Sequence, residues 1–90
     1  MKNGKVYDFV DHLHFGDELW FFYHGRKYFP EGWMQGKRFD LHLYEMAEHG
    51  KKYIWMGDES GYPVDQFLQA TIWDGKNFWD AEKDMEWVDD

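Results

Sequence analysis

The stretch Phe21-Phe22-Tyr23-His24-Gly25-Arg26-Lys27-Tyr28-Phe29 places five aromatic residues around a central His-Gly pair. Glycine tolerates a positive φ angle and histidine is enriched there, so this pair predicts the two-residue turn of a β-hairpin. From Glu18 to the turn the hydrophobic pattern has a period of two, which is typical of a strand. The stretch therefore predicts two antiparallel strands, one over residues 18–23 and the other over residues 26–33.

Beyond this hairpin the alternation continues in two more segments. Phe39, Leu41 and Leu43 alternate with Arg38, Asp40, His42 and Tyr44 in a third predicted strand, and residues 52–56 form a fourth. Glycine-containing turns separate the four strands, which favours a simple meander.

Helical spacing is found at both ends of the chain. Apolar residues at i, i+3, i+4 and i+7 predict an N-terminal helix over residues 5–14. A short helix is predicted over 63–70, a brief strand over 71–73, and a final helix over 77–88 with Asn77 as its N-cap and an acidic outer face. The predicted fold is a single α+β domain over residues 1–90, an antiparallel four-stranded meander with an N-terminal helix and C-terminal helices.

The period-two and helical patterns also predict which side chains form the hydrophobic core. Aromatic residues make up 22% of the chain, so they supply most of the bulk that can be buried. The predicted core consists of Phe9, Leu13, Leu19, Phe21, Phe39, Leu41, Phe67 and Met85.

The composition limits the class of partner. Eighteen Asp and Glu residues against ten Lys and Arg give a formal net charge of −8. This charge disfavours direct binding to nucleic acid or to anionic membranes, because phosphate groups are bound by cations. The acidic excess either serves solubility alone or favours a basic protein surface as partner, such as the basic channel of a nucleic-acid enzyme.

The sequence contains no cysteine and no apolar run long enough for a signal peptide or a membrane span. The expected location is the cytoplasm.

The cations are concentrated in four turns that share a Gly-cation-x-aromatic order. Seven of the ten Lys and Arg residues lie in these turns, at Gly25, Gly36, Gly50 and Gly75. In a meander the turns at Gly25 and Gly50 lie at the same end of the sheet. We therefore expect a cluster there of Arg26, Lys27, Lys51 and Lys52, with the cations in water and the aromatic residues packed inside.

Few residues suggest catalysis or metal binding. Asp40 and His42 share a strand face, so a third ligand from a neighbouring strand would complete a metal site, but a solvated His–Asp pair is the better interpretation. Pairs of carboxylates such as Asp58-Glu59 are expected by chance in so acidic a chain, and no nucleophile-elbow sequence surrounds Ser60. We expect no catalytic residue, no metal and no cofactor.

The first strand is apolar on both faces. Leu19, Phe21 and Tyr23 lie on one face, while Trp20 and Phe22 lie on the other. Either the helices cover both faces, or the second face is an open patch that binds a protein, a sugar ring or a second copy of the chain.

Short motifs over most of the chain resemble those of a loose group of short, acidic bacterial proteins of the phage and mobile-element type. The matching residues are Tyr7-Asp8-Phe9 in the first helix, Gly16 and Glu18 before the first strand, Tyr23, Gly25 and Tyr28 in the hairpin, and Asp74-Gly75-Lys76. That group has no established activity. The resemblance implies an inhibitor, an immunity factor or a counter-defence protein.

These observations lead to two functional hypotheses. The first is a non-enzymatic, acidic protein-binding domain that docks on a basic partner. Its expected partner-binding residues are Asp80, Glu82, Asp84, Glu86, Trp20 and Phe22. The alternative is a small-ligand or carbohydrate binder that uses the aromatic sheet face.

Overall fold

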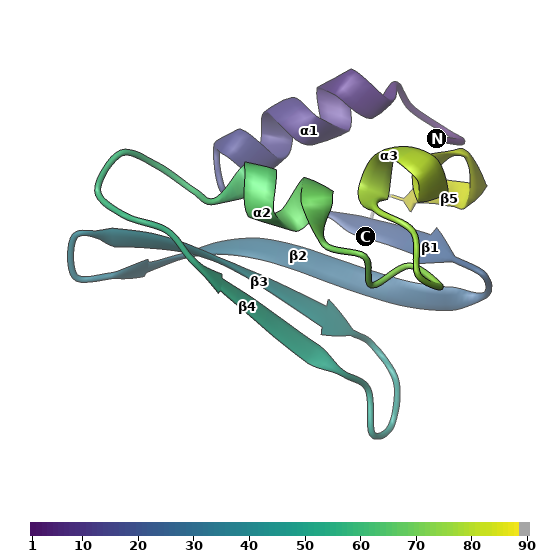
Figure 1. Ribbon diagram of the computed structural model, residues 1–90. Coiled ribbons are helices and arrows are strands. Elements are labelled where there is room, and N and C mark those ends of the chain that lie inside the picture. The colour runs from purple at the N-terminus through teal and green to yellow at the C-terminus, as the bar shows by residue number, and fades with distance from the viewer. Residues whose placement is uncertain (89–90) are drawn as a thin grey trace.

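The computed structural model describes residues 1–88 and arranges them as a sheet with helices on one side (Figure 1). In chain order the elements are α1 (Val6–His14), β1 (Trp20–Tyr23), β2 (Arg26–Gln35), β3 (Arg38–Glu45), β4 (Lys52–Met56), α2 (Val64–Gln69), α3 (Phe78–Ala81), the 3₁₀ helix η1 (Glu82–Asp84) and β5 (Met85–Val88).

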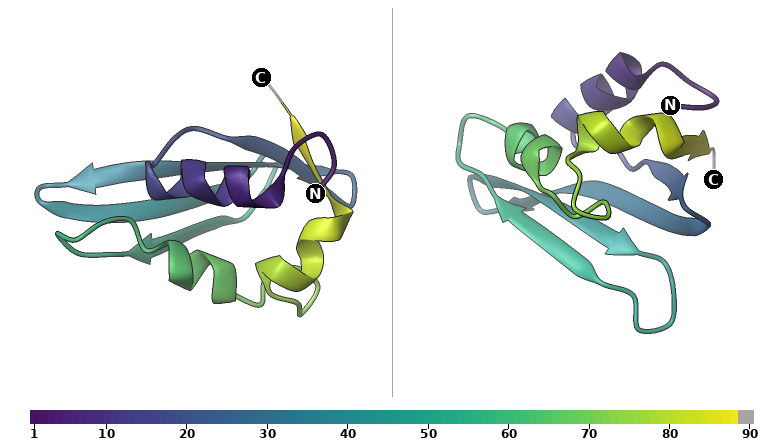
Figure 2. Two further views of the ribbon diagram at one scale, coloured as in Figure 1. Left: turned by 90° about the horizontal axis from the view of Figure 1, so that it is seen from above. Right: turned by 45° about the vertical axis from the view of Figure 1, so that its right-hand side comes forward.

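All strand pairs are antiparallel, and the order in the sheet is β4-β3-β2-β1-β5. The α+β class, the N-terminal helix and the meander of β1 to β4 are confirmed. The prediction of only four strands was wrong, because β5 pairs with the free edge of β1 (Figure 2). The predicted strand over 71–73 was also wrong, because Trp73 makes only an isolated bridge to Lys76.

The C-terminal segment explains the missed strand. The predicted helix over 77–88 ends with η1, and the chain is extended from Met85 onward. Phe78, Ala81 and Met85 have helical spacing and are all buried, but Met85 is buried from a strand. The strand gives backbone partners to the edge of β1, and Lys2 in turn pairs with the outer edge of β5.

The hairpin turn has the predicted geometry. His24 has φ 48° and Gly25 has φ 78°, as a two-residue turn with two left-handed residues requires. The turn is therefore set by local sequence, and it fixes the register that pairs Phe21 with Tyr28.

A close backbone contact attaches the end of α1 to β2. The Gly32 amide donates to the Gly16 carbonyl at 3.1 Å, and the Tyr62 ring lies against both glycines. A Cβ atom on Gly32 would lie 2.5 Å from the Gly16 Cα atom. Only glycine fits at this crossing.

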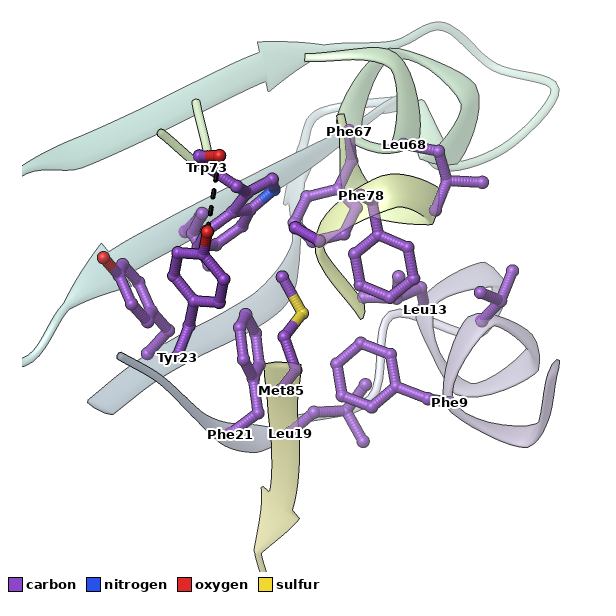
Figure 3. Close-up of a cluster of buried hydrophobic side chains, with 14 of the residues drawn as sticks. Phe9, Leu13, Leu19, Phe21, Tyr23, Phe67, Leu68, Trp73, Phe78 and Met85 are labelled. Carbon is purple, nitrogen blue, oxygen red and sulfur yellow. Dashed lines mark hydrogen bonds between the residues drawn. The ribbon is translucent and has the colours of Figure 1, made fainter. Parts of the chain in front are cut away.

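The core lies between the helices and the sheet. Figure 3 shows side chains from α1, β1, α2, α3 and β5 converging there, and Phe9, Phe21, Phe78 and Met85 are fully buried. Burial is confirmed for all the predicted core residues except Phe39. That residue is half-buried because it lies at the end of the sheet, where its ring contacts Tyr62 at 4.9 Å between centroids.

None of the helices in residues 1–88 has the length and apolar character needed to cross a bilayer.

Candidate functional site

One side of the sheet faces away from all three helices, and no element of residues 1–88 packs over it (Figure 1). Directly paired residues of an antiparallel sheet point to the same face, so the register shows which side chains are on this side. We call this side the uncovered face. Its residues are Trp20, Phe22, Lys27, Phe29, Glu31, Trp33, Gln35, Arg38, Asp40, His42, Tyr44, Lys52, Ile54, Met56, Glu86 and Val88.

Three rings on the uncovered face form a stack across three strands. Trp20 lies on Phe29 with centroids 4.3 Å apart and planes 21° apart, and Phe29 lies beside Tyr44 at 6.0 Å and 21°. The ammonium groups of Lys27 and Lys52 lie 4.7 Å and 5.1 Å from the outer rings, Trp20 and Tyr44. The flat faces of the stack are therefore in contact with other groups, and mainly ring edges remain for a ligand. A sugar ring, which stacks on a free ring face, has little access to these three residues.

Asp40 and His42 share this face, as predicted, but the expected solvated pair was wrong, because both residues are buried and each has a different partner. Arg38 donates to both oxygens of the Asp40 carboxylate at 2.9 Å, and this bidentate contact, followed by the Gly57 amide, lowers the pKa of Asp40 despite its burial. Within residues 1–88 no group of three or more His, Asp or Glu residues is placed to hold a metal ion.

His42 belongs to a second polar group. Its Nδ1 atom is 3.1 Å from the Tyr44 hydroxyl, and the Trp33 ring stacks on it at 5.6 Å. Burial, and then the hydrogen bond to Glu31, raises the pKa of Tyr44. Polar groups in the middle of the face are thus satisfied within the chain, so the face needs no ligand to complete them.

The predicted cluster of cations at one end of the sheet is present. Tyr28, which follows Arg26 and Lys27, pairs with Glu45, and the neighbouring Tyr44 pairs with Lys52. The two turns that carry the cations therefore lie at the same end. Arg26, Lys51 and Lys52 are exposed, as expected, whereas Lys27 is half-buried, and the ammonium group of Lys52 lies over the Tyr44 ring. Lys27 packs on Trp20, and Arg26 donates to Glu45 at 3.0 Å.

Glu45 is the centre of this end of the sheet. Its side chain is only 10% exposed, and its oxygens accept from Arg26, from the Tyr28 hydroxyl at 3.2 Å and from the Lys51 amide. These hydrogen bonds lower the pKa of Glu45, and the bond from Arg26 has the largest effect. Burial, and to a smaller extent the negative charge of Glu45, raises the pKa of Tyr28 to about 12. The arrangement holds the two turns together.

The six predicted partner-binding residues do not form one surface. Trp20, Phe22 and Glu86 lie together on the uncovered face, where Phe22 pairs directly with Glu86. Asp84 lies near the hairpin turn, 3.7 Å from His24 Nε2.

The remaining two lie on the helical side. Glu82 pairs with the N-terminal ammonium group of Met1, whereas Asp80 is exposed in α3. The acidic residues therefore do not lie on one helical face. The predicted long helix with an acidic outer face required that they do.

A second surface is formed by α1 and α3. Tyr7 is 72% exposed, Trp79 is 42% exposed, and their ring centroids are 5.7 Å apart. Asp8 and Asp11 lie on the same outward side of α1 as Tyr7, and Asp80 follows Trp79 in the chain. We call these five residues the acidic helical face.

The charges of this surface are not compensated locally. Within residues 1–88, Asp8, Asp11 and Asp80 have no ion-pair partner, whereas Glu45, Asp40 and Glu82 are each paired with a cation. The helices α1, α2 and α3 contain no Lys or Arg at all. The nearest cations along the chain are Lys5, which precedes α1, and Lys83 in η1.

Sequence reasoning missed the pairing of Tyr7 with Trp79. The two residues are 72 positions apart, and only the packing of α3 against α1 brings them together. The available signal was a large aromatic residue on the outward side of each helix, next to an aspartate.

Comparison with known proteins gives no family for the chain: no protein-family model, curated protein or solved structure matches it.

Proposed function

We propose that the protein is a non-enzymatic binding domain whose acidic helical face docks on a basic surface of a partner protein. The observation that carries the proposal is the exposed Tyr7–Trp79 pair, flanked by three aspartates that lack ion-pair partners within residues 1–88. A cytoplasmic inhibitor, immunity factor or counter-defence protein acting on a nucleic-acid enzyme fits this chemistry.

The surface combines two properties that binding to a basic partner requires. Exposed aromatic residues supply the central apolar contact of an interface, and Arg or Lys side chains pack well on their rings. Unpaired carboxylates around the rings attract cations over a distance and speed association. The absence of Lys and Arg from the three helices leaves this attraction unopposed on the helices themselves.

The test uses one variant that removes the charges with little change in shape and another that removes the exposed rings. Asp8→Asn, Asp11→Asn and Asp80→Asn are combined in one variant, and Tyr7→Ala with Trp79→Ala in another. The matched control is Asp58→Asn, Glu59→Gln and Asp65→Asn, which removes three exposed carboxylates elsewhere. Glu82 is left unchanged because its contact with the N-terminus supports the fold.

Each protein is used to capture partners from a lysate of the native host, and a captured protein is then purified and its affinity measured. Both helical-face variants should lose the partner, and the control should retain it. Retention by both helical-face variants would contradict the proposal.

A further inference from the structure

We infer that the uncovered face of the sheet is the interface between two copies of this chain, which pack sheet on sheet as a symmetric dimer. The inference concerns the face opposite to the acidic helical face and does not depend on the proposed function.

The first argument is the apolar exposure of this face. Trp33 in β2 is 49% exposed, and Ile54 and Met56 in β4 are 51% and 61% exposed, with only β3 between the two strands. Trp33 pairs with Asp40, and Asp40 pairs with Met56, so the two large side chains lie on either side of one residue. Large apolar side chains that gather on one face are typical of an interaction surface.

The second argument identifies the occupant by charge. Among residues 1–88, the uncovered face carries three cations, Lys27, Arg38 and Lys52, and three carboxylates, Glu31, Asp40 and Glu86. Over residues 1–88 the formal charge of this face is zero, so the excess of carboxylates in these residues lies elsewhere. A strongly basic or acidic partner would meet as many like charges as opposite ones here. A second copy of the same neutral face meets no net repulsion, and in a two-fold interface cations of one copy can face carboxylates of the other.

The third argument is area. Strands about 4.8 Å apart with a rise of about 3.3 Å per residue give a five-stranded face of roughly 500 Å². Two such faces bury about 1,000 Å² in total, which is near the lower limit for a specific interface. The half-buried rings of Trp20, Phe29 and Tyr44 add apolar area to this contact through their outward edges.

Such a dimer has a distinctive response to salt. Each copy carries a net charge of −8, so the two copies repel each other beyond the neutral interface. Screening by salt weakens that repulsion, so dimerisation should strengthen as ionic strength rises. Binding of a basic partner to the acidic helical face should instead weaken as ionic strength rises.

The experiment is analytical ultracentrifugation of the full chain over a wide range of concentrations, at low and high salt. Two variants add the same charge in different places. Ile54→Lys with Met56→Lys changes the uncovered face, and Phe15→Lys with Met46→Lys changes exposed apolar residues elsewhere. Circular dichroism checks that each variant is folded.

The parent chain should sediment at twice its 11.1 kDa mass, more completely at high salt. The uncovered-face variant should sediment as a folded monomer, and the other variant should remain a dimer. A parent chain that stays monomeric up to millimolar concentration overturns the inference. So does a dimer that survives the uncovered-face substitutions, or one that only the other pair of substitutions disrupts.

Discussion

Trp20 and Phe29 stack face to face, 4.3 Å apart, on the side of the sheet that no helix of residues 1–88 covers. One residue further along the same strand, Phe21 is fully buried on the opposite side. The domain thus uses aromatic residues in two ways, as core on the helical side and as surface on the other. This division, together with the separation of charge between the two sides, is the basis of both proposals.

Substitution at adjacent positions of β1 should show this division directly. Phe21→Ala should lower the free energy of unfolding by about 3–5 kcal/mol, because it removes a large ring from a close-packed core. Phe22→Ala, on the uncovered face and 37% exposed, should cost about 1 kcal/mol or less in dilute protein. Urea denaturation of both variants measures the difference. Equal losses would show that the two faces are equally buried.

The crossing of Gly16 and Gly32 gives a second test of the packing. Gly32→Ala should destabilise the fold by about 1–3 kcal/mol, because its Cβ atom would overlap the Gly16 backbone and the Tyr62 ring. The matched control is Gly36→Asn, since Gly36 has φ 61° and no atom within 4 Å of its Cβ position, and asparagine tolerates that conformation. Thermal unfolding should show a clear loss for the first variant and a small one for the second. A stable Gly32→Ala protein would mean that α1 and β2 do not approach this closely.

The fold was largely predictable from local signals. A few adjacent residues are enough to predict three of its features. These are the hairpin at His24-Gly25, the start of β4 at Lys52 and the helical spacing of Phe9 and Leu13. The segment at Met85 was not predictable in this way, because its spacing suits a helix and its strand exists only through the edge of β1. Segments this short take the structure that their neighbours in space provide.

The candidate sites were less predictable than the fold. The sequence indicated that Trp20 and Phe22 share a face, but a pattern in one strand does not show whether another element covers it. The Tyr7–Trp79 pair depends on how α3 packs against α1, which no local pattern encodes.

The buried hydroxyl of Tyr28 makes stability depend on alkaline pH. Its pKa is about 12 in the folded protein, whereas an unfolded tyrosine ionises at about 10. The folded state therefore favours the protonated form, so the contribution of Tyr28 to stability is complete below pH 10 and is lost as the pH rises towards about 12.

Absorbance titration of the parent chain and of Tyr28→Phe should isolate this group. The difference between the two curves should show one tyrosine ionising at about 12. In Glu45→Gln the pKa of Tyr28 should fall but stay above 10, because burial is the larger cause and remains. Ionisation at about 10 in a protein that is still folded would exclude the buried contact with Glu45.

The affinity of the captured partner, measured at several ionic strengths, tests most directly whether the acidic helical face is the docking surface. The parent chain should bind more weakly as salt increases, and the variant with Asp8→Asn, Asp11→Asn and Asp80→Asn should bind weakly with little dependence on salt. Both proteins should unfold at similar urea concentrations, since exposed charges contribute little to stability. Unchanged affinity and salt dependence in this variant, or a loss of binding confined to Trp20→Ala and Phe22→Ala proteins, would contradict the account and place the partner on the uncovered face.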